Sequence, residues 1–139
     1  MPYLPALAWA PSPDDDDAPF WERCNQRRLC FQRCDDCRFV VHPPLSVCPA
    51  CQSTNRGWLE APREAFVFAF TWIHTAADAA VEACTPYNVV LVAFEGLPDV
   101  KLISNVVDVQ HGGLKTGDRL ALVWEPGSEG QLLPRFRLA

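Results

Sequence analysis

Residues 34–51 read CDDCRFVVHPPLSVCPAC, and this stretch decides the fold. Two residues separate Cys34 from Cys37, and two separate Cys48 from Cys51. That spacing lets one tight turn aim both sulfurs at the same point, and two such turns on facing hairpins complete a tetrahedron. Structural Zn²⁺ sites have this geometry. The four cysteines are therefore predicted to hold one zinc ion in a small ribbon.

Several alternatives compete with a zinc site for the same cysteines. Four thiolates leave no open position for water or substrate, so the metal is expected to fold the ribbon rather than catalyse a reaction. Iron in a rubredoxin-like site is the rival to zinc, but such turns usually carry Gly where this chain has Arg38 and Gln52. Unligated or redox-active cysteines are the weaker alternatives, because two CxxC pairs occur in one short segment. Seven cysteines, an odd count without a secretory signal, argue against a disulfide framework.

No self-contained active site is predicted. Cys84 is a conceivable nucleophile, but a reactive thiol needs a neighbouring base, and the sequence supplies none. The histidines form no spaced pair with a carboxylate, and no GxSxG, P-loop or GxGxxG is present. The cysteines and histidines left without a function are Cys24, Cys30, Cys84, His42, His74 and His111.

The chain divides into three segments. Residues 1–19 hold five of the thirteen prolines and a block of four Asp, so an extended or disordered arm is expected. Alternatively, its apolar residues anchor it on a partner: Tyr3, Leu4, Leu7 and Trp9. Residues 20–62 are predicted to form a short helix, Phe20 to about Arg28, and the zinc ribbon. Phe20 and Trp21 either pack on this chain or dock on another.

Residues 63–139 are predicted to form a five-stranded OB-fold barrel. Short β-prone runs alternate with turn residues at roughly ten-residue spacing, and no long helix is indicated. The expected strands are 66–74, 88–94, 100–107, 119–124 and 132–138. Period-two alternation predicts a buried face. Its expected members are Phe66, Phe68, Phe70, Leu91, Leu120, Leu122 and Trp124.

Charge and hydropathy exclude several classes of protein. The longest apolar run, residues 65–73, is too short to span a bilayer, where roughly 20 residues are needed. No signal peptide is indicated, so a cytoplasmic protein without membrane contact is expected. Residues 20–63 contain seven Arg and four acidic residues, whereas residues 64–139 contain nine acidic and five basic residues. An acidic barrel with its aromatics inside argues against nucleic-acid binding, the alternative function for a zinc ribbon with an OB-fold.

Sequence motifs in a fixed order resemble the DUF35 family over residues 19–138. In the first half they are PFW at 19–21, LCFQRCDDC at 29–37, HPPLSVCPACQS at 42–53 and Trp58. In the second half they are PYNVVLVAFEG at 86–96, LISNVVD at 102–108, KTGDRLALVWE at 115–125 and LPRFR at 133–137. Arg38, where Gly is common, and the acidic Pro-rich arm depart from the family pattern.

The resemblance implies a rubredoxin-like zinc ribbon followed by an OB-fold, with Cys34, Cys37, Cys48 and Cys51 as ligands. It also implies a thiolase-like partner, and contact with acyl-CoA through that complex. Members support acyl transfer or a retro-aldol cleavage in steroid side-chain breakdown, or associate with MaoC-like hydratases. We therefore expect a non-catalytic accessory subunit; a self-sufficient enzyme using Cys84 or a histidine is the remaining alternative. The surface expected to meet the partner or the CoA phosphates is basic: Arg23, Arg27, Arg28, Arg33 and Arg38.

Overall fold

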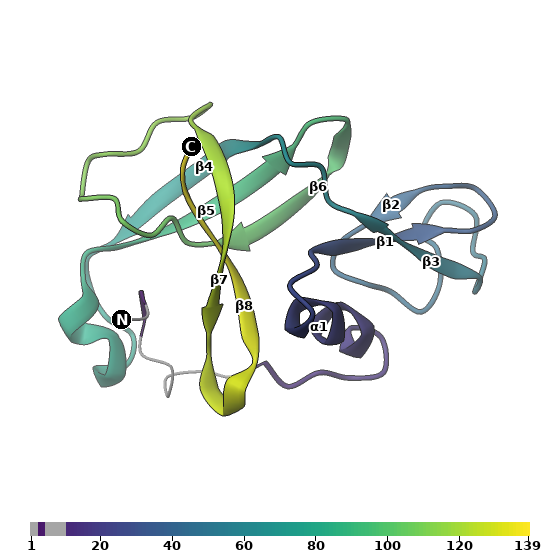
Figure 1. The fold of residues 1–139 in the computed structure, drawn as a ribbon, viewed down its shortest axis with the longest axis horizontal. Coiled ribbons are helices and arrows are strands. Elements are labelled where there is room, and N and C mark those ends of the chain that lie inside the picture. The colour runs from purple at the N-terminus through teal and green to yellow at the C-terminus, as the bar shows by residue number, and fades with distance from the viewer. Residues whose placement is uncertain (1–2, 5–10) are drawn as a thin grey trace.

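The computed structural model describes residues 3–4 and 11–139 (Figure 1). The chain is mainly β, with one short α-helix, a small ribbon sheet and a curled five-stranded sheet. The predicted fold class, a zinc ribbon followed by an OB-fold barrel, is confirmed. No helix within the described residues has the length and apolar character to cross a membrane.

Helix α1, Ala18–Asn25, precedes the ribbon. Pro19 occupies its first turn, where a missing N–H costs nothing. The helix ends because Arg27 adopts a left-handed conformation, with φ 57°. The Arg28 N–H then donates to the Arg23 carbonyl and the Arg27 N–H to the Cys24 carbonyl. This is a Schellman cap, and it turns the chain into the ribbon.

The ribbon is a three-stranded antiparallel sheet of order β2-β1-β3. Its strands are β1 (Cys30–Cys34), β2 (Val40–Val41) and β3 (Arg56–Glu60). Cys34 at the end of β1 pairs with Arg56 at the start of β3. The loops that carry the cysteine pairs therefore extend from one end of the sheet.

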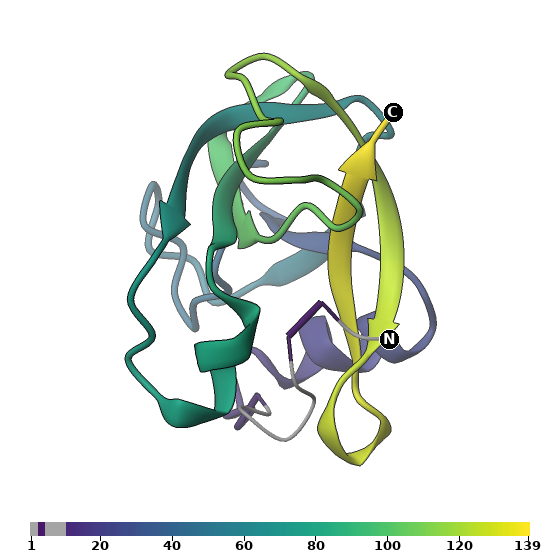
Figure 2. The same ribbon diagram turned by 90° about the vertical axis from the view of Figure 1, so that its left-hand side faces the viewer.

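The second sheet has the order β6-β5-β4-β7-β8 and curls into a barrel (Figure 2). A parallel bridge between Val106 and Phe136 joins the segment after β6 to β8, at the opposite ends of the strand order. The connection between β4 and β5 contains a short 3₁₀ turn, η1 (Ala79–Cys84). A second 3₁₀ turn, η2 (Ser128–Gly130), lies in the β7–β8 hairpin. The strands are β4 (Ala65–Ile73), β5 (Tyr87–Phe94), β6 (Leu97–Ser104), β7 (Arg119–Pro126) and β8 (Leu132–Leu138).

The predicted inward face is wrong for most of its members. Leu120 is buried at 3% exposure, as expected, but Phe68 is 51% and Phe70 36% exposed. A β-bulge between Val67 and Ala69 leaves Phe68 out of the register, and beyond it Phe70 pairs with the inward-facing Val90 yet stays partly exposed. Before the bulge, the small residues Ala65 and Val67 fill the core.

The other misplaced residues have separate causes. Leu91 is half-buried because the even positions of β5, such as Val90 and Val92, face the core. Leu122 is 37% exposed and Trp124 half-buried because β7 pairs with β4 only up to Leu120. Beyond that point the β7–β8 hairpin projects away from the sheet (Figure 1). Phe66 is half-buried, on the outer side of β4.

The ribbon and the barrel share one hydrophobic core. Phe20 and Cys24 of α1 are buried in the same cluster as barrel residues. Phe31 of β1 is fully buried, and its ring lies edge-on to Phe94 of β5, with centroids 5.0 Å apart. Phe20 therefore packs within its own chain, while Trp21 remains half-buried against the core.

Candidate metal centre and interdomain pocket

The four predicted ligands come together at the tip of the ribbon. The sulfurs of Cys34 and Cys51 lie 3.6 Å apart, as do those of Cys37 and Cys48. All four sulfur atoms lie within 4.8 Å of one another. A tetrahedral ion with metal–sulfur bonds of about 2.3 Å places its ligands about 3.8 Å apart, so these sulfurs fit one ion. The four cysteines therefore have the geometry of a metal-binding site.

Two matching turns present the sulfurs. The Arg38 N–H donates to the Cys34 carbonyl at 3.0 Å, and the Gln52 N–H donates to the Cys48 carbonyl at 2.9 Å. Arg38 and Gln52 both have positive φ, 71° and 62°, the conformation that favours glycine. The absence of Gly therefore does not prevent either turn from forming. The Cys37 N–H donates to the Cys34 sulfur, and this bond helps to hold the pKa of the Cys34 thiol at about 7.

Polar contacts brace one turn against the other. Asp36 in the first loop accepts hydrogen bonds from the Ser53 hydroxyl and the Asn55 amide, which follow the second cysteine pair. Gly57 lies against Asp35, and a Cβ there would come within 2.6 Å of the Asp35 carboxylate. These contacts hold the two loops against each other.

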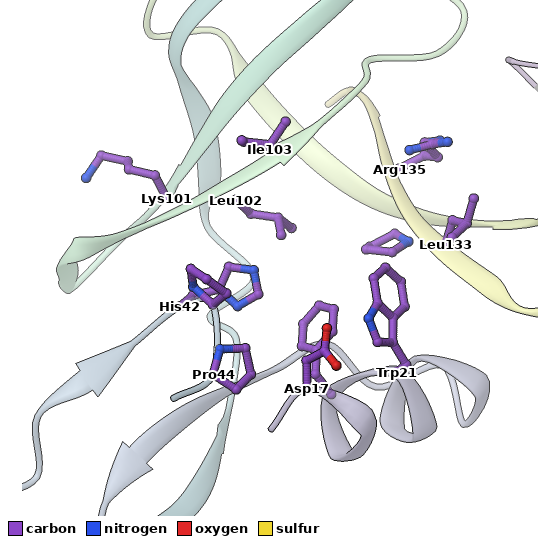
Figure 3. Close-up of a pocket in the computed structure, with 12 residues that line it drawn as sticks. Asp17, Trp21, His42, Pro44, Lys101, Leu102, Ile103, Leu133 and Arg135 are labelled. Atoms are coloured by element: carbon purple, nitrogen blue, oxygen red, sulfur yellow. The ribbon is translucent and has the colours of Figure 1, made fainter. Parts of the chain in front are cut away.

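A pocket of about 300 Å³ lies between α1, the loop after β2, and strands β6 and β8 (Figure 3). Its lining is mostly apolar, with Lys101 and Arg135 at opposite ends and Asp17 on the helix side. The lining residues are Asp17, Phe20, Trp21, His42, Pro43, Pro44, Lys101, Leu102, Ile103, Leu133, Pro134 and Arg135. Shape and composition suit an apolar group that carries a polar or anionic end.

His42 is packed at this pocket between aromatic rings. Its ring centroid lies 4.9 Å from that of Phe20 and 5.3 Å from that of Phe31. Burial lowers the pKa of His42 to about 4, so the ring is neutral at pH 7. Its Nδ1 is buried and has no hydrogen-bond partner among residues 3–4 and 11–139. His42 therefore packs as a structural side chain.

A second polar cluster holds the start of the arm against the barrel. The Tyr3 hydroxyl accepts hydrogen bonds from both the backbone N–H and the side-chain amide of Asn88, each at 2.8 Å. The Tyr3 N–H donates to the Glu125 carboxylate. Burial of the Tyr3 ring raises its pKa. Leu7 and Trp9, the other proposed anchors, lie outside the described residues, and Leu4 is half-buried.

The predicted basic surface is not one free patch. The Arg23 guanidinium lies 4.7 Å from the centre of the Trp58 ring, and Arg28 forms an ion pair with Glu60 at 2.6 Å. Arg27 and Arg63 instead border a groove of about 600 Å³ between the ribbon base and the β7–β8 hairpin. That these arginines meet a partner or CoA phosphates therefore stays a prediction.

The remaining cysteines lie apart from the four-cysteine cluster. Cys24 and Cys30 are buried, and burial raises the pKa of Cys24 to about 12. Cys84 is half-buried at the end of η1. Sequence reasoning missed the interdomain pocket, because its walls come from segments up to 118 residues apart, from Asp17 to Arg135. It also missed the fully buried Asn88, for which the sequence carries no local signal.

Comparisons with known proteins agree with this geometry. Residues 21–55 match the model of the ChsH2 rubredoxin-like zinc ribbon domain, and residues 58–125 that of the ChsH2 C-terminal OB-fold domain. The solved structure of an Ltp2-ChsH2(DUF35) aldolase contains a similar chain, with 31% identity and a TM-score of 0.83. The similarity covers 93% of this chain and 98% of that one.

Two further relatives are more distant or longer. A DUF35-family protein of unknown function from Sulfolobus solfataricus shares the fold, with a TM-score of 0.63 at 19% identity, covering 87% of this chain and 83% of that one. A probable enoyl-CoA hydratase alpha subunit from Thermomonospora curvata is 33% identical over 134 residues, or 96% of this chain. That match spans only 41% of the relative's length.

Proposed function

Because the chain belongs to the ChsH2 (DUF35) family, we propose that it is a non-catalytic accessory subunit of an enzyme acting on acyl-CoA. One observation carries the proposal. The chain matches almost the whole length of a chain in the Ltp2-ChsH2(DUF35) aldolase, and the name of that aldolase includes a second component, Ltp2. The name of the Thermomonospora relative, an enoyl-CoA hydratase subunit, supports association with acyl-CoA chemistry.

We propose further that the partner is thiolase-like and carries the reacting groups, either for acyl transfer or for a retro-aldol cleavage such as that of a steroid side chain. The site geometry supports a non-catalytic role for this chain. A metal ion held by four thiolates has no open coordination position. The His42 imidazole is half-buried and neutral at pH 7. Among the described residues, no hydrogen bond joins a cysteine to a histidine, and the His42 Nδ1 has no partner.

The proposed metal is one structural Zn²⁺ per chain, held by Cys34, Cys37, Cys48 and Cys51. Thiolate donors and the tetrahedral arrangement of the sulfurs support zinc over Mg²⁺ or Ca²⁺. The ion would supply folding energy to a ribbon that is too small to bury a large core of its own.

Nucleic-acid binding is the competing function, and the structure removes one argument against it. Phe68 and Phe70 are exposed rather than buried, and OB-folds stack bases on exposed aromatic rings. The acidic balance of residues 64–139 still opposes it, since nucleic-acid affinity depends on a basic surface. A salt-sensitive gel shift with single-stranded DNA would favour this alternative.

The test is co-expression of this chain with a thiolase-like protein from the same organism, and of each protein alone. Size-exclusion chromatography with light scattering measures complex formation, and release of product from an acyl-CoA measures activity. We expect a stable hetero-oligomer whose activity exceeds that of either component. Turnover by this chain alone, or a partner indifferent to its presence, would contradict the proposal.

A further inference from the structure

The outer side of strands β4, β5 and β6 forms an apolar face that nothing in the described chain covers. We call it the β4–β6 face and define it by Phe66, Phe68, Leu91, Lys101 and Ile103. Ile103 is 70% exposed and Phe68 51%, and they are the two most exposed of the large hydrophobic side chains on the barrel. The other three residues are half-buried.

The strand register places these residues side by side. Phe66 pairs with Ala93, which pairs with Lys101, and Ala69 pairs with Leu91, which pairs with Ile103. Each row crosses all three strands on the outer side. Phe68 is the extra residue of the β4 bulge, and its ring lies 4.7 Å from the Lys101 ammonium. The five residues therefore form one continuous surface.

An apolar outer face departs from the ordinary pattern of a barrel. The outer side of a solvated sheet normally carries polar residues, because alternation separates an apolar inner face from a polar outer one. Large exposed apolar patches mark sites of interaction with other proteins. Core packing does not account for this face, since the barrel core is already filled by the opposite sides of the same strands.

Charge favours a different protein over a second copy as the occupant. Lys101 is the one charged member of the face, and each chain carries a formal net charge of −5. Two copies joined through this face would bring together two chains of like net charge. Lys101 donates one hydrogen bond to the Pro98 carbonyl, and an ammonium has three donors, so it can also donate to an acceptor on another protein.

We propose that the β4–β6 face is the surface on which the acyl-CoA enzyme subunit docks. The inference rests on the proposed function, and it specifies the partner's contact: an apolar patch with a carboxylate or carbonyl opposite Lys101. A few residues of an interface carry most of its binding energy. Phe68 and Ile103 are the most exposed large side chains of this face, so we expect them to be among those residues.

Docking on this face also bears on the interdomain pocket. Lys101 and Ile103 belong both to the β4–β6 face and to the lining of the pocket, and Figure 3 shows Ile103 and Leu102 on opposite sides of β6. A protein seated on the face therefore reaches the rim of the pocket along β6. The pocket then opens at the junction of the two subunits.

The experiment measures the affinity of the purified, zinc-loaded chain for the co-expressed thiolase-like protein by biolayer interferometry. Phe68→Ser, Ile103→Glu and Lys101→Glu change the face. Val47→Glu and Leu138→Glu are matched controls, because their side chains are 42% and 38% exposed at other places. Thermal melting and zinc content establish that each variant is folded.

We expect Ile103→Glu and Phe68→Ser each to weaken binding at least tenfold, Lys101→Glu to weaken it and reduce its salt dependence, and both controls to bind like the unaltered chain. If the unaltered chain binds and the folded face variants bind equally well, the docking surface is wrong and the proposed function stands. If the controls lose as much affinity as the face variants, the docking surface is also wrong. If the unaltered chain itself does not bind, the proposed function is wrong and this inference falls with it.

Discussion

Two phenylalanines in one barrel provide a sharp test of which side of each strand faces the core. Phe136 of β8 is 1% exposed, and its ring lies edge-on to Phe94 with centroids 6.3 Å apart. Phe68 of β4 is 51% exposed. The substitution to Ala deletes the same atoms at both positions, so a difference in stability reports the environment alone.

The expected costs differ by a factor of about 2.5. Removing a buried Phe side chain costs about 3–5 kcal/mol, from lost transfer free energy and the cavity left behind. At Phe68 roughly half of the transfer free energy of about 1.5–3 kcal/mol is lost, together with an exposed cation–π contact worth about 0.5 kcal/mol, giving about 1.3–2 kcal/mol in total. At about 4 °C per kcal/mol for a chain of this size, the melting temperature should fall by about 12–20 °C for Phe136→Ala and about 5–8 °C for Phe68→Ala.

The measurement is urea unfolding of the zinc-loaded protein, followed by circular dichroism and by intrinsic fluorescence. Coincident transitions by the two probes justify a two-state free energy. Val67→Ala, next to Phe68 but fully buried, is a further comparison and should cost more than Phe68→Ala despite losing fewer atoms. If Phe68→Ala proved as destabilising as Phe136→Ala, the bulge and the inward face of β4 would be wrongly placed.

Three further predictions concern the ribbon and its junction with the barrel. Cys48→Ser should abolish binding of about one zinc per chain, measured by elemental analysis, and should unfold the ribbon while leaving much of the barrel's β signal; unchanged melting would contradict the metal assignment. Arg38→Gly should raise stability by up to about 1 kcal/mol because Arg38 has φ 71°, whereas Arg33→Gly, within β1, should lower it by about 0.5–1 kcal/mol; equal effects would refute the strain argument. Burial lowers the pKa of His42 from its usual 6.5 to about 4 in the folded protein. The stability that neutral His42 contributes is therefore complete above pH 6.5 and is lost as the pH falls towards 4, by at most about 3 kcal/mol. His42→Gln should flatten that slope in denaturation curves taken between pH 6.5 and 4, and an unchanged slope would show that another group titrates.

The four-cysteine cluster and the order of ribbon and barrel could be predicted from the sequence. Each CxxC spacing predicts a local turn that presents two sulfurs, and the pairing of β1 with β3 brings the two turns together. The β-rich second half was likewise readable, since strand-forming residues and turn residues alternate along the chain. Both signals depend on neighbours in the sequence, and tertiary packing did not alter them.

Which side of each strand faces the core depends on tertiary packing. Alternation of residues defines two faces of a strand but does not say which is buried. The bulge at Phe68 also exchanges the inward and outward positions along β4, and no glycine in the sequence marks it. The interdomain pocket and the Tyr3–Asn88 contact were likewise invisible, because each joins residues far apart in the chain. Such contacts arise from the closure of the barrel and its docking on the ribbon, where packing of the whole core outweighs any local preference.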